Sequence, residues 1–206
     1  LMMKKASAAP KGVDLITGYN YQQLSSKFAM GAVFYNQACT NYLGDKQLRS
    51  ASKPNDAPYK NGAKYTGKEH VWDEAFGYWG AAAHTLTLSP KESYEVAKKK
   101  NFAAADYNKD GVVDAGTEMT YAHAYYASGF DKGGKTNYLE TVTRAFLTGR
   151  ETITSANGQK LGWNGRNGGK GIIKQAAIIC SNWEKVIAEA VFKYAGSVYK
   201  DLENMK

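Results

Sequence analysis

The feature that most constrains the fold is an apolar stripe in residues 172–203. Apolar side chains recur there every three or four residues, as on one face of a long amphipathic helix. They are Ile173, Ala176, Ala177, Cys180, Trp183, Val186, Ile187, Ala190, Val191 and Tyr194. No segment shows the alternating pattern of a half-buried strand, so other helices must cover this stripe. The sequence therefore predicts an all-α fold.

Five other segments show helical spacing or begin with helix-capping residues. They span residues 19–43, 67–87, 90–100, 115–128 and 135–153. Ser89 and Glu92 can form a capping box around the start of the third segment, with Pro90 at the first helical position. We therefore expect a bundle of about six helices.

The intervening segments are polar or rich in glycine, asparagine and proline. Residues 1–18 indicate an N-terminal arm, residues 44–66 a long surface loop, and residues 155–171 a flexible Gly/Asn-rich loop. The 206 residues fall within the range of one domain, and no repeat of fixed period divides them. We predict a single helical domain over residues 1–206.

A net charge of +8 would suit a nucleic-acid-binding protein if the cations were clustered. The lysines are scattered instead, and the densest run, Lys98–Lys100, lies near a predicted helix end, where cations favour the helix dipole. No stretch approaches the ~18 apolar residues of a membrane span. We expect neither nucleic-acid binding nor a transmembrane segment.

The two cysteines, Cys39 and Cys180, form no CxxC motif, so no zinc or redox site follows from them. In an oxidising compartment they could pair and close a long loop. In a reducing one they would be two buried thiols. Because the chain begins at Leu1 rather than methionine, we expect a processed chain or a fragment, from which an export signal would already have been removed.

The strongest motif is DYNKDGVVD at residues 106–114, which matches the front of an EF-hand-type calcium loop. Calcium is a hard cation that takes six to eight oxygen ligands. Alternate positions place Asp106, Asn108 and Asp110 on one side of a tight turn, and Gly111 allows the bend. Val112 would contribute its backbone carbonyl. The sequence therefore predicts a calcium site here.

The back of this loop departs from the pattern. Asp114 would coordinate directly or through water, but Thr117 stands at position twelve, where a bidentate glutamate is expected. Glu118 follows one place later, so either the loop carries one extra residue, as Gly116 would permit, or Glu118 does not ligate. A weak site needs the millimolar calcium found outside cells, so we expect a structural calcium ion and an exported protein.

A second candidate site lies in the segment HVWDEAFGYWG. On a helix, His70, Asp73 and Glu74 share one face, a usable half-site for a transition metal such as iron or zinc. Gly77 and Gly80 would let a ligand or a neighbouring helix approach. The alternative is a hydrogen-bonded pair inside the bundle. His123 is a candidate partner from another helix.

The runs HVWDEAFGYWGAA, AAADYNKDGVVDAGTE and YAHAYYAS resemble a bacterial family known as domain of unknown function 4856. The resemblance is carried best by residues 67–128 and implies an exported or lipid-anchored helical protein. A more remote resemblance is to imelysin-like periplasmic proteins, bundles linked to iron uptake that carry a GxHxxE motif. Gly67, His70 and Asp73 depart from that motif in spacing and residue type.

These features favour an exported, calcium-binding protein of the cell envelope that binds a metal ion or a small ligand at His70, Asp73 and Glu74. The alternative is a structural subunit of a surface or filamentous assembly, suggested by the arm, the Gly/Asn-rich loop and the 15 tyrosines. An enzyme of unknown reaction comes third, because no nucleophile motif or HExxH motif is present.

Overall fold

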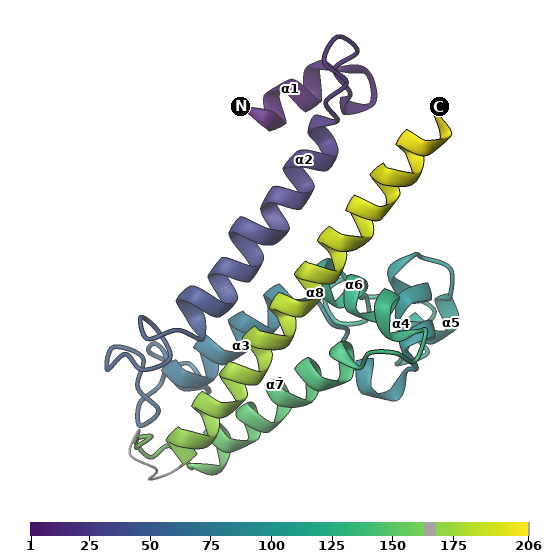
Figure 1. Ribbon diagram of the computed structural model, residues 1–206. Coiled ribbons are helices and arrows are strands. Elements are labelled where there is room, and N and C mark those ends of the chain that lie inside the picture. The colour runs from purple at the N-terminus through teal and green to yellow at the C-terminus, as the bar shows by residue number, and fades with distance from the viewer. Residues whose placement is uncertain (163–167, 206) are drawn as a thin grey trace.

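The computed structural model describes residues 1–162 and 168–205, and helices dominate both ranges (Figure 1). Within them, the pairings typical of strands are limited to two isolated bridges, Val13–Asn20 and Pro58–Thr66. The all-α fold class predicted from the sequence is confirmed.

The helices follow one another along the chain with a long connection between η2 and α3. They are α1 (Met2–Ala8), η1 (Pro10–Gly12), α2 (Tyr21–Phe28), η2 (Ala29–Tyr42), α3 (Gly67–Trp79), η3 (Thr85–Thr87), α4 (Pro90–Ala97), α5 (Phe102–Ala105), α6 (Ala122–Asp131), α7 (Tyr138–Ser155) and α8 (Gly169–Asn204). Here η2 is a π-helix and η1 and η3 are 3-10 helices. The described chain thus has more α-helices than the six expected, because the predicted arm contains α1 and the short α5 precedes the acidic loop.

Two of the predicted helix boundaries that were wrong have a local reason. The helix expected over 67–87 ends at Trp79 because Gly80 adopts a left-handed conformation with a φ of 82°. A Cβ atom at Gly80 would lie 2.9 Å from the carbonyl oxygen of Tyr121, so only glycine fits this crossing. The helix expected from residue 115 begins instead at Ala122, since Asp114 accepts hydrogen bonds from the amides of the intervening turn.

The start of α7 is set by a residue of the preceding helix. Asp131 at the end of α6 is buried, and its carboxylate accepts hydrogen bonds from the backbone amides of Tyr138 and Leu139 and from the hydroxyl of Thr136. These amides are among the first of α7, which have no partner within the helix. The helix predicted to begin near residue 135 therefore begins at Tyr138.

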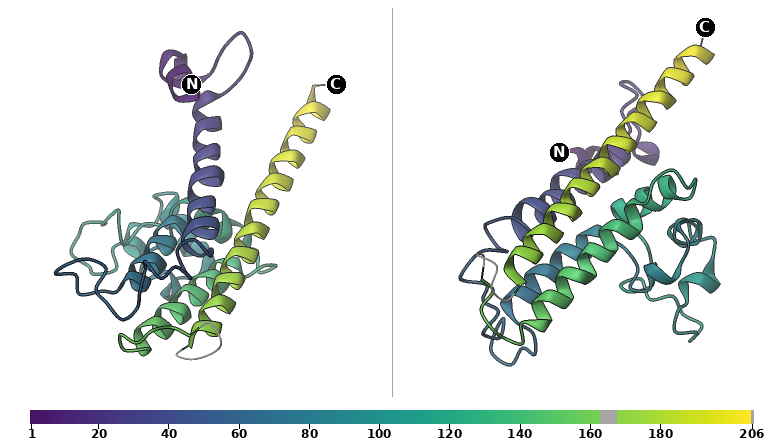
Figure 2. Two further views of the ribbon diagram at one scale, coloured as in Figure 1. Left: turned by 90° about the vertical axis from the view of Figure 1, so that its left-hand side faces the viewer. Right: turned by 60° about the horizontal axis from the view of Figure 1, so that its bottom comes forward.

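The core lies where the first half of α8 packs between α7 and η2, with α3 beneath (Figures 1 and 2). Trp79 and Trp183 meet edge to face at its centre, with ring centroids 4.9 Å apart. The buried residues of α8 include Ile172 and Ile179, one position before the predicted Ile173 and Cys180. The predicted stripe was therefore rotated slightly, and its last member, Tyr194, is 46% exposed.

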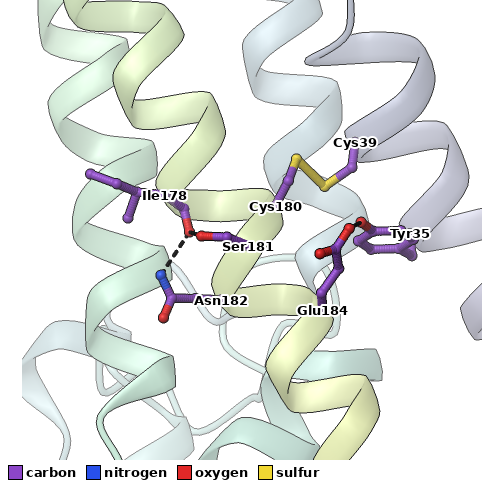
Figure 3. The surroundings of a disulfide bond; sticks show 7 residues. All are labelled: Tyr35, Cys39, Ile178, Cys180, Ser181, Asn182 and Glu184. Carbon is purple, nitrogen blue, oxygen red and sulfur yellow. Dashed lines mark hydrogen bonds between the residues drawn. A yellow bond between two sulfur atoms is a disulfide. The ribbon is translucent and has the colours of Figure 1, made fainter.

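A disulfide bond joins Cys39 of η2 to Cys180 of α8, across 141 residues of sequence (Figure 3). This decides between the two alternatives that the sequence left open. Tyr35 lies four residues before Cys39 on η2, and Glu184 lies four residues after Cys180 on α8. The hydroxyl of Tyr35 donates a hydrogen bond to the Glu184 carboxylate. The two helices are thus fastened to each other at this level.

No helix in residues 1–162 and 168–205 is long and apolar enough to cross a membrane. The predicted Gly/Asn-rich loop lies between α7 and α8, and its residues 163–167 fall outside the described residues.

Candidate functional site

The first turn of α3 is fastened to the long loop that precedes it. Thr66 and Glu69 form a capping box, in which the Thr66 side chain accepts from the Glu69 amide and the Glu69 carboxylate accepts from the Thr66 amide. The Thr66 hydroxyl also donates to the side chain of buried Asn55. This box was not predicted from the sequence, although its T-x-x-E signature is visible there. It fixes the position of the next turn, which carries His70.

The three residues predicted to share a face of α3 line one surface pocket of about 630 Å³. Its walls come from η2, the 44–66 loop and α3. The lining residues are Phe34, Tyr65, His70, Asp73, Glu74, Gly77 and Tyr78. A pocket of this volume falls within the usual range for small organic ligands.

Aromatic rings form one side of the pocket. The His70 imidazole stacks on the Tyr59 ring with centroids 3.7 Å apart, and the Tyr65 ring lies 5.9 Å from both. The Lys53 ammonium group sits 5.0 Å from the centroid of the Tyr59 ring. Sequence reasoning missed Tyr59 and Tyr65, since their only signal was the presence of two tyrosines in a Pro/Gly-rich loop.

The acidic residues of the face have different partners. Asp73 accepts a 2.8 Å hydrogen bond from Nε of Arg150 on α7, and the same guanidinium donates at 2.7 Å to Glu69. Glu74 lies 3.9 Å from Nε2 of His70 and pairs with no arginine among the described residues. Asp73 is therefore held in an ion-pair network with α7, whereas Glu74 supplies the carboxylate next to the aromatic rings.

The charge of Glu74 affects its surroundings. The Tyr42 hydroxyl has a raised pKa, first because it is partly buried and second because the Glu74 carboxylate disfavours a nearby phenolate. Tyr42 and Phe34 both pack near the Tyr78 ring, at centroid distances of 5.9 and 5.7 Å. This wall is thus aromatic, with the Glu74 carboxylate beside it.

The two glycines of this helix have different roles. A Cβ atom added to Gly77 would meet nothing within 4 Å, so this position opens the pocket. Gly80 instead allows the close crossing with Tyr121 described above. Both glycines were predicted to let a ligand or a neighbouring helix approach. In the structure Gly77 lies at the pocket, and Gly80 lies at a crossing of two chain segments.

The described parts of the chain contain no ready-made metal cluster, either at the pocket or in the acidic loop 106–118. No three or more His, Cys, Asp or Glu side chains there form a group that could hold a metal ion. His123, the predicted partner from another helix, does not line the pocket. It is buried on α6 against Trp183, and burial, with the nearby Lys27 charge, lowers its pKa to about 4.

The acidic loop folds back on itself as its sequence suggests. Asp106 and Asn108 both accept from the Asp110 amide, at 3.2 and 2.9 Å, so two predicted ligands converge on one point. Asp110 in turn accepts from the Val112 amide at 2.8 Å. Gly111 supplies the bend with a φ of 83°. The side-chain oxygens thus bind the loop's own backbone amides.

Glu118 closes the loop from behind. It is 5% exposed, and its carboxylate accepts from the amides of Tyr107, Asn108 and Asp114 at 2.8–3.2 Å. Hydrogen bonds from the Gly116 and Thr117 amides lower the pKa of Asp114. A glutamate one place past position twelve therefore reaches the front of the loop. The donor set contains only oxygen, which is the kind of ligand that calcium prefers.

The loop is anchored to the chain that leaves α3. The His84 ring stacks on Tyr107 with centroids 4.8 Å apart, and its Nε2 lies 2.8 Å from the carbonyl oxygen of Ala104. The Ala83 amide donates to the Thr117 carbonyl at 2.7 Å. The α3 helix thus carries the pocket along its side, and the segment that follows its end contacts the acidic loop.

The fold and these two features define an all-α domain with an aromatic surface pocket and an oxygen-rich loop. Residues 15–205 match the family model described as "Domain of unknown function (DUF4856)", and the chain belongs to this family. The resemblance found in residues 67–128 is thereby confirmed and extended to nearly the whole chain. No curated protein and no solved structure matches it. The match does not bear on imelysin-like proteins.

Proposed function

We propose that this domain is an exported binding protein that holds a small ligand in the pocket of His70, Asp73 and Glu74. The observation that carries the proposal is that these residues, which share a face on α3, meet aromatic side chains from two other elements around one cavity. Aromatic faces beside the Glu74 carboxylate, which lies 3.9 Å from His70 Nε2, favour a ligand with a cationic group and an apolar body. Such ligands include quaternary ammonium compounds.

A transition metal is the alternative occupant of the same place. His70 and Glu74 would supply two donors, whereas protein metal sites commonly use three or more protein ligands. Asp73 would have to leave Arg150 to become a third. These contacts favour the organic ligand, and the test includes a metal.

The test is thermal unfolding of the chain with choline, spermidine, glucose or zinc. We expect choline or spermidine to raise the Tm, and Glu74→Gln to remove that rise because it deletes the charge and keeps the shape. Glu151→Gln, at an exposed position of α7, is the matched control and should retain the rise in Tm. A shift that survives Glu74→Gln, or one produced by glucose alone, would refute the cationic ligand.

We further propose that loop 106–118 binds one structural calcium ion through Asp106, Asn108, Asp110, Val112, Asp114 and Glu118. Support comes from the convergence of Asp106 and Asn108 and from the return of Glu118 to the loop. Calcium would replace the backbone amides as the partner of these oxygens. At a concentration ten times its Kd it would add about 1.4 kcal/mol to the free energy of unfolding.

Thermal unfolding in calcium and in a chelator tests this site. We expect a rise in Tm that Asp110→Ala abolishes, while Asp45→Ala, an exposed aspartate outside the loop, preserves it. Glu118→Gln tests the back of the loop, because an unchanged calcium affinity would show that Glu118 does not ligate. Identical melting of the unaltered chain in both conditions contradicts the proposal.

Export is proposed on two grounds. A disulfide bond persists in oxidising compartments and is rare in the cytosol, and a weak calcium site fills only at extracellular calcium concentrations. The alternative function, a subunit of a surface assembly, draws its support from a different part of the molecule, the exposed end of α8.

A further inference from the structure

The second half of α8 leaves the body of the molecule. Every residue from Val191 to Asn204 is exposed. Tyr194 still contacts α6 through a hydrogen bond to the Tyr126 hydroxyl, and beyond it Figures 1 and 2 show the helix rising away from α4, α6 and α7. The stretch from Val191 to Asn204 rises about 21 Å at 1.5 Å per residue. This stretch continues a 36-residue helix anchored in the core, but its own residues gain little burial, and most helical stability in proteins comes from packing of an apolar face.

Apolar side chains gather on one face of this stretch. Val191, Val198 and Leu202 recur at spacings of seven and four and are 57–61% exposed. Phe192 and Tyr199 border the same face at 75% and 63%. The opposite face carries polar and charged residues, namely Lys193, Ser197, Lys200 and Asn204. A helix with one apolar stripe of this kind normally buries it.

The apolar face points toward α2 and η2. Cys180, Glu184 and Val191 are spaced four and seven residues apart, so they share a face, and the first two contact η2. The two helices run in opposite directions and both rise out of the body beyond the disulfide (Figure 1). On α2, Leu24 and Phe28 are one turn apart and 43% and 60% exposed. Two antiparallel helices therefore present apolar side chains that the described parts of the chain leave partly exposed to solvent.

We propose that a second copy of this chain docks on this surface, with α2 and the end of α8 of each copy forming an intermolecular four-helix bundle. An antiparallel pair with one apolar side is half of such a bundle, and two identical halves satisfy each other through a two-fold axis. The inference concerns a different surface from the ligand pocket and does not depend on it.

The exposed apolar surface is large enough for a specific dimer. The exposed large apolar side chains of α2 and the end of α8 that face solvent are Leu24, Phe28, Val191, Phe192, Val198, Tyr199 and Leu202. At roughly 60–120 Å² for each buried side chain, reduced for their partial exposure, they offer about 500 Å² per copy. With the polar rim, a two-fold pair would bury roughly 1,200–1,600 Å², the size of standard specific interfaces.

A membrane surface fits this helix less well. Helices that lie on anionic membranes are rich in lysine and arginine on the polar face. Here Lys193 and Lys200 are offset by Asp201 and Glu203, so residues 191–204 carry no net charge. Electrostatic attraction to lipid headgroups is therefore missing, whereas burial against apolar protein surface needs none.

Sedimentation equilibrium of the whole chain tests the dimer. We expect a monomer–dimer equilibrium with a Kd of about micromolar order, the weak end of the range for interfaces of this size, because the two helices present no Trp or Arg anchor on this surface. Val198→Glu should weaken it about tenfold or more by placing a charge in the apolar face. Ser197→Glu adds the same charge at the next position, on the polar face, and should leave the Kd within about twofold.

Helical content and Tm are measured for both variants, and Leu202→Glu serves as a second disruptive variant on the same stripe. A monomeric unaltered chain at all concentrations would overturn the proposal. So would equal effects of Val198→Glu and Ser197→Glu, or binding to phosphatidylserine vesicles in place of self-association.

Discussion

The packing of α7 against α3 depends on the absence of a side chain at Gly149. A Cβ atom at this position would lie 2.0 Å from Cζ2 and 2.5 Å from Cη2 of the Trp72 indole. Trp72 is 1% exposed, and its Nε1 donates a 2.7 Å hydrogen bond to the carbonyl oxygen of Phe146. The ring also meets the Phe146 ring edge to face. The indole therefore has no free space into which it could move.

Gly149→Ala has two opposing effects on the free energy of unfolding, and the destabilising effect is the larger. Alanine in place of glycine stabilises a helix interior by about 1 kcal/mol. Overpacking a rigid core costs about 1–3 kcal/mol, and a strained or broken Trp72 hydrogen bond costs about 1 kcal/mol more. We expect a net destabilisation of about 2 kcal/mol, which lowers the Tm of a chain of this length by roughly 4–8 °C.

Thermal and chemical unfolding of Gly149→Ala and Gly77→Ala measure this difference directly. Gly77 also lies within a helix, but its Cβ would meet nothing within 4 Å, so that variant receives only the helical gain and should be more stable than the unaltered chain. If Gly149→Ala proves as stable as Gly77→Ala, the contact between α3 and α7 through Trp72 is wrong.

Three further predictions concern the disulfide, a buried histidine and a helix cap. Replacing Cys39 and Cys180 by alanine should lower the free energy of unfolding by about 2–5 kcal/mol, because the bond closes a loop of 141 residues. Unfolding in urea with and without reductant checks this. An effect of reductant on the double variant would contradict it. His123 has a pKa of about 4 in the folded chain and about 6.5 when unfolded, so the unfolded state binds more protons between these two pH values. The free energy of unfolding therefore falls as the pH drops from about 6.5 to about 4, by up to about 3 kcal/mol. His123→Gln should flatten the Tm profile in that window, and a profile parallel to that of the unaltered chain would disprove the assignment. Thr66→Ala should lower the free energy of unfolding by about 1–2 kcal/mol, because it removes the cap of α3 and a partner of Asn55. The loss is measured as a lower urea midpoint, which Thr148→Ala, at an exposed position of α7, should change little.

The candidate pocket was half visible in the sequence. Helical spacing alone places His70, Asp73 and Glu74 on one face, because residues three and four apart are neighbours on a helix. It cannot show that Arg150, far along the chain, pairs with Asp73 and leaves Glu74 beside His70. Nor can it show that Tyr59 stacks on His70, since the conformation of a long loop depends on what it packs against.

The acidic loop shows the same division within a short segment. Its residue types and spacing determine the turn, the bend at Gly111 and the oxygen-only donor set. The return of Glu118 depends on the turn at 115–118 and on the anchoring of the loop to the chain after α3.

The sequence by itself determined that this protein is built of helices, because apolar periodicity, capping residues and glycine positions act within a few residues of one another. It also determined which residue types could bind calcium or share a face with His70. Tertiary structure alone decided the pairing of Cys39 with Cys180, the true buried face of α8 and the length of that helix left uncovered. Those properties depend on contacts between residues distant in sequence, whose geometry no local pattern encodes.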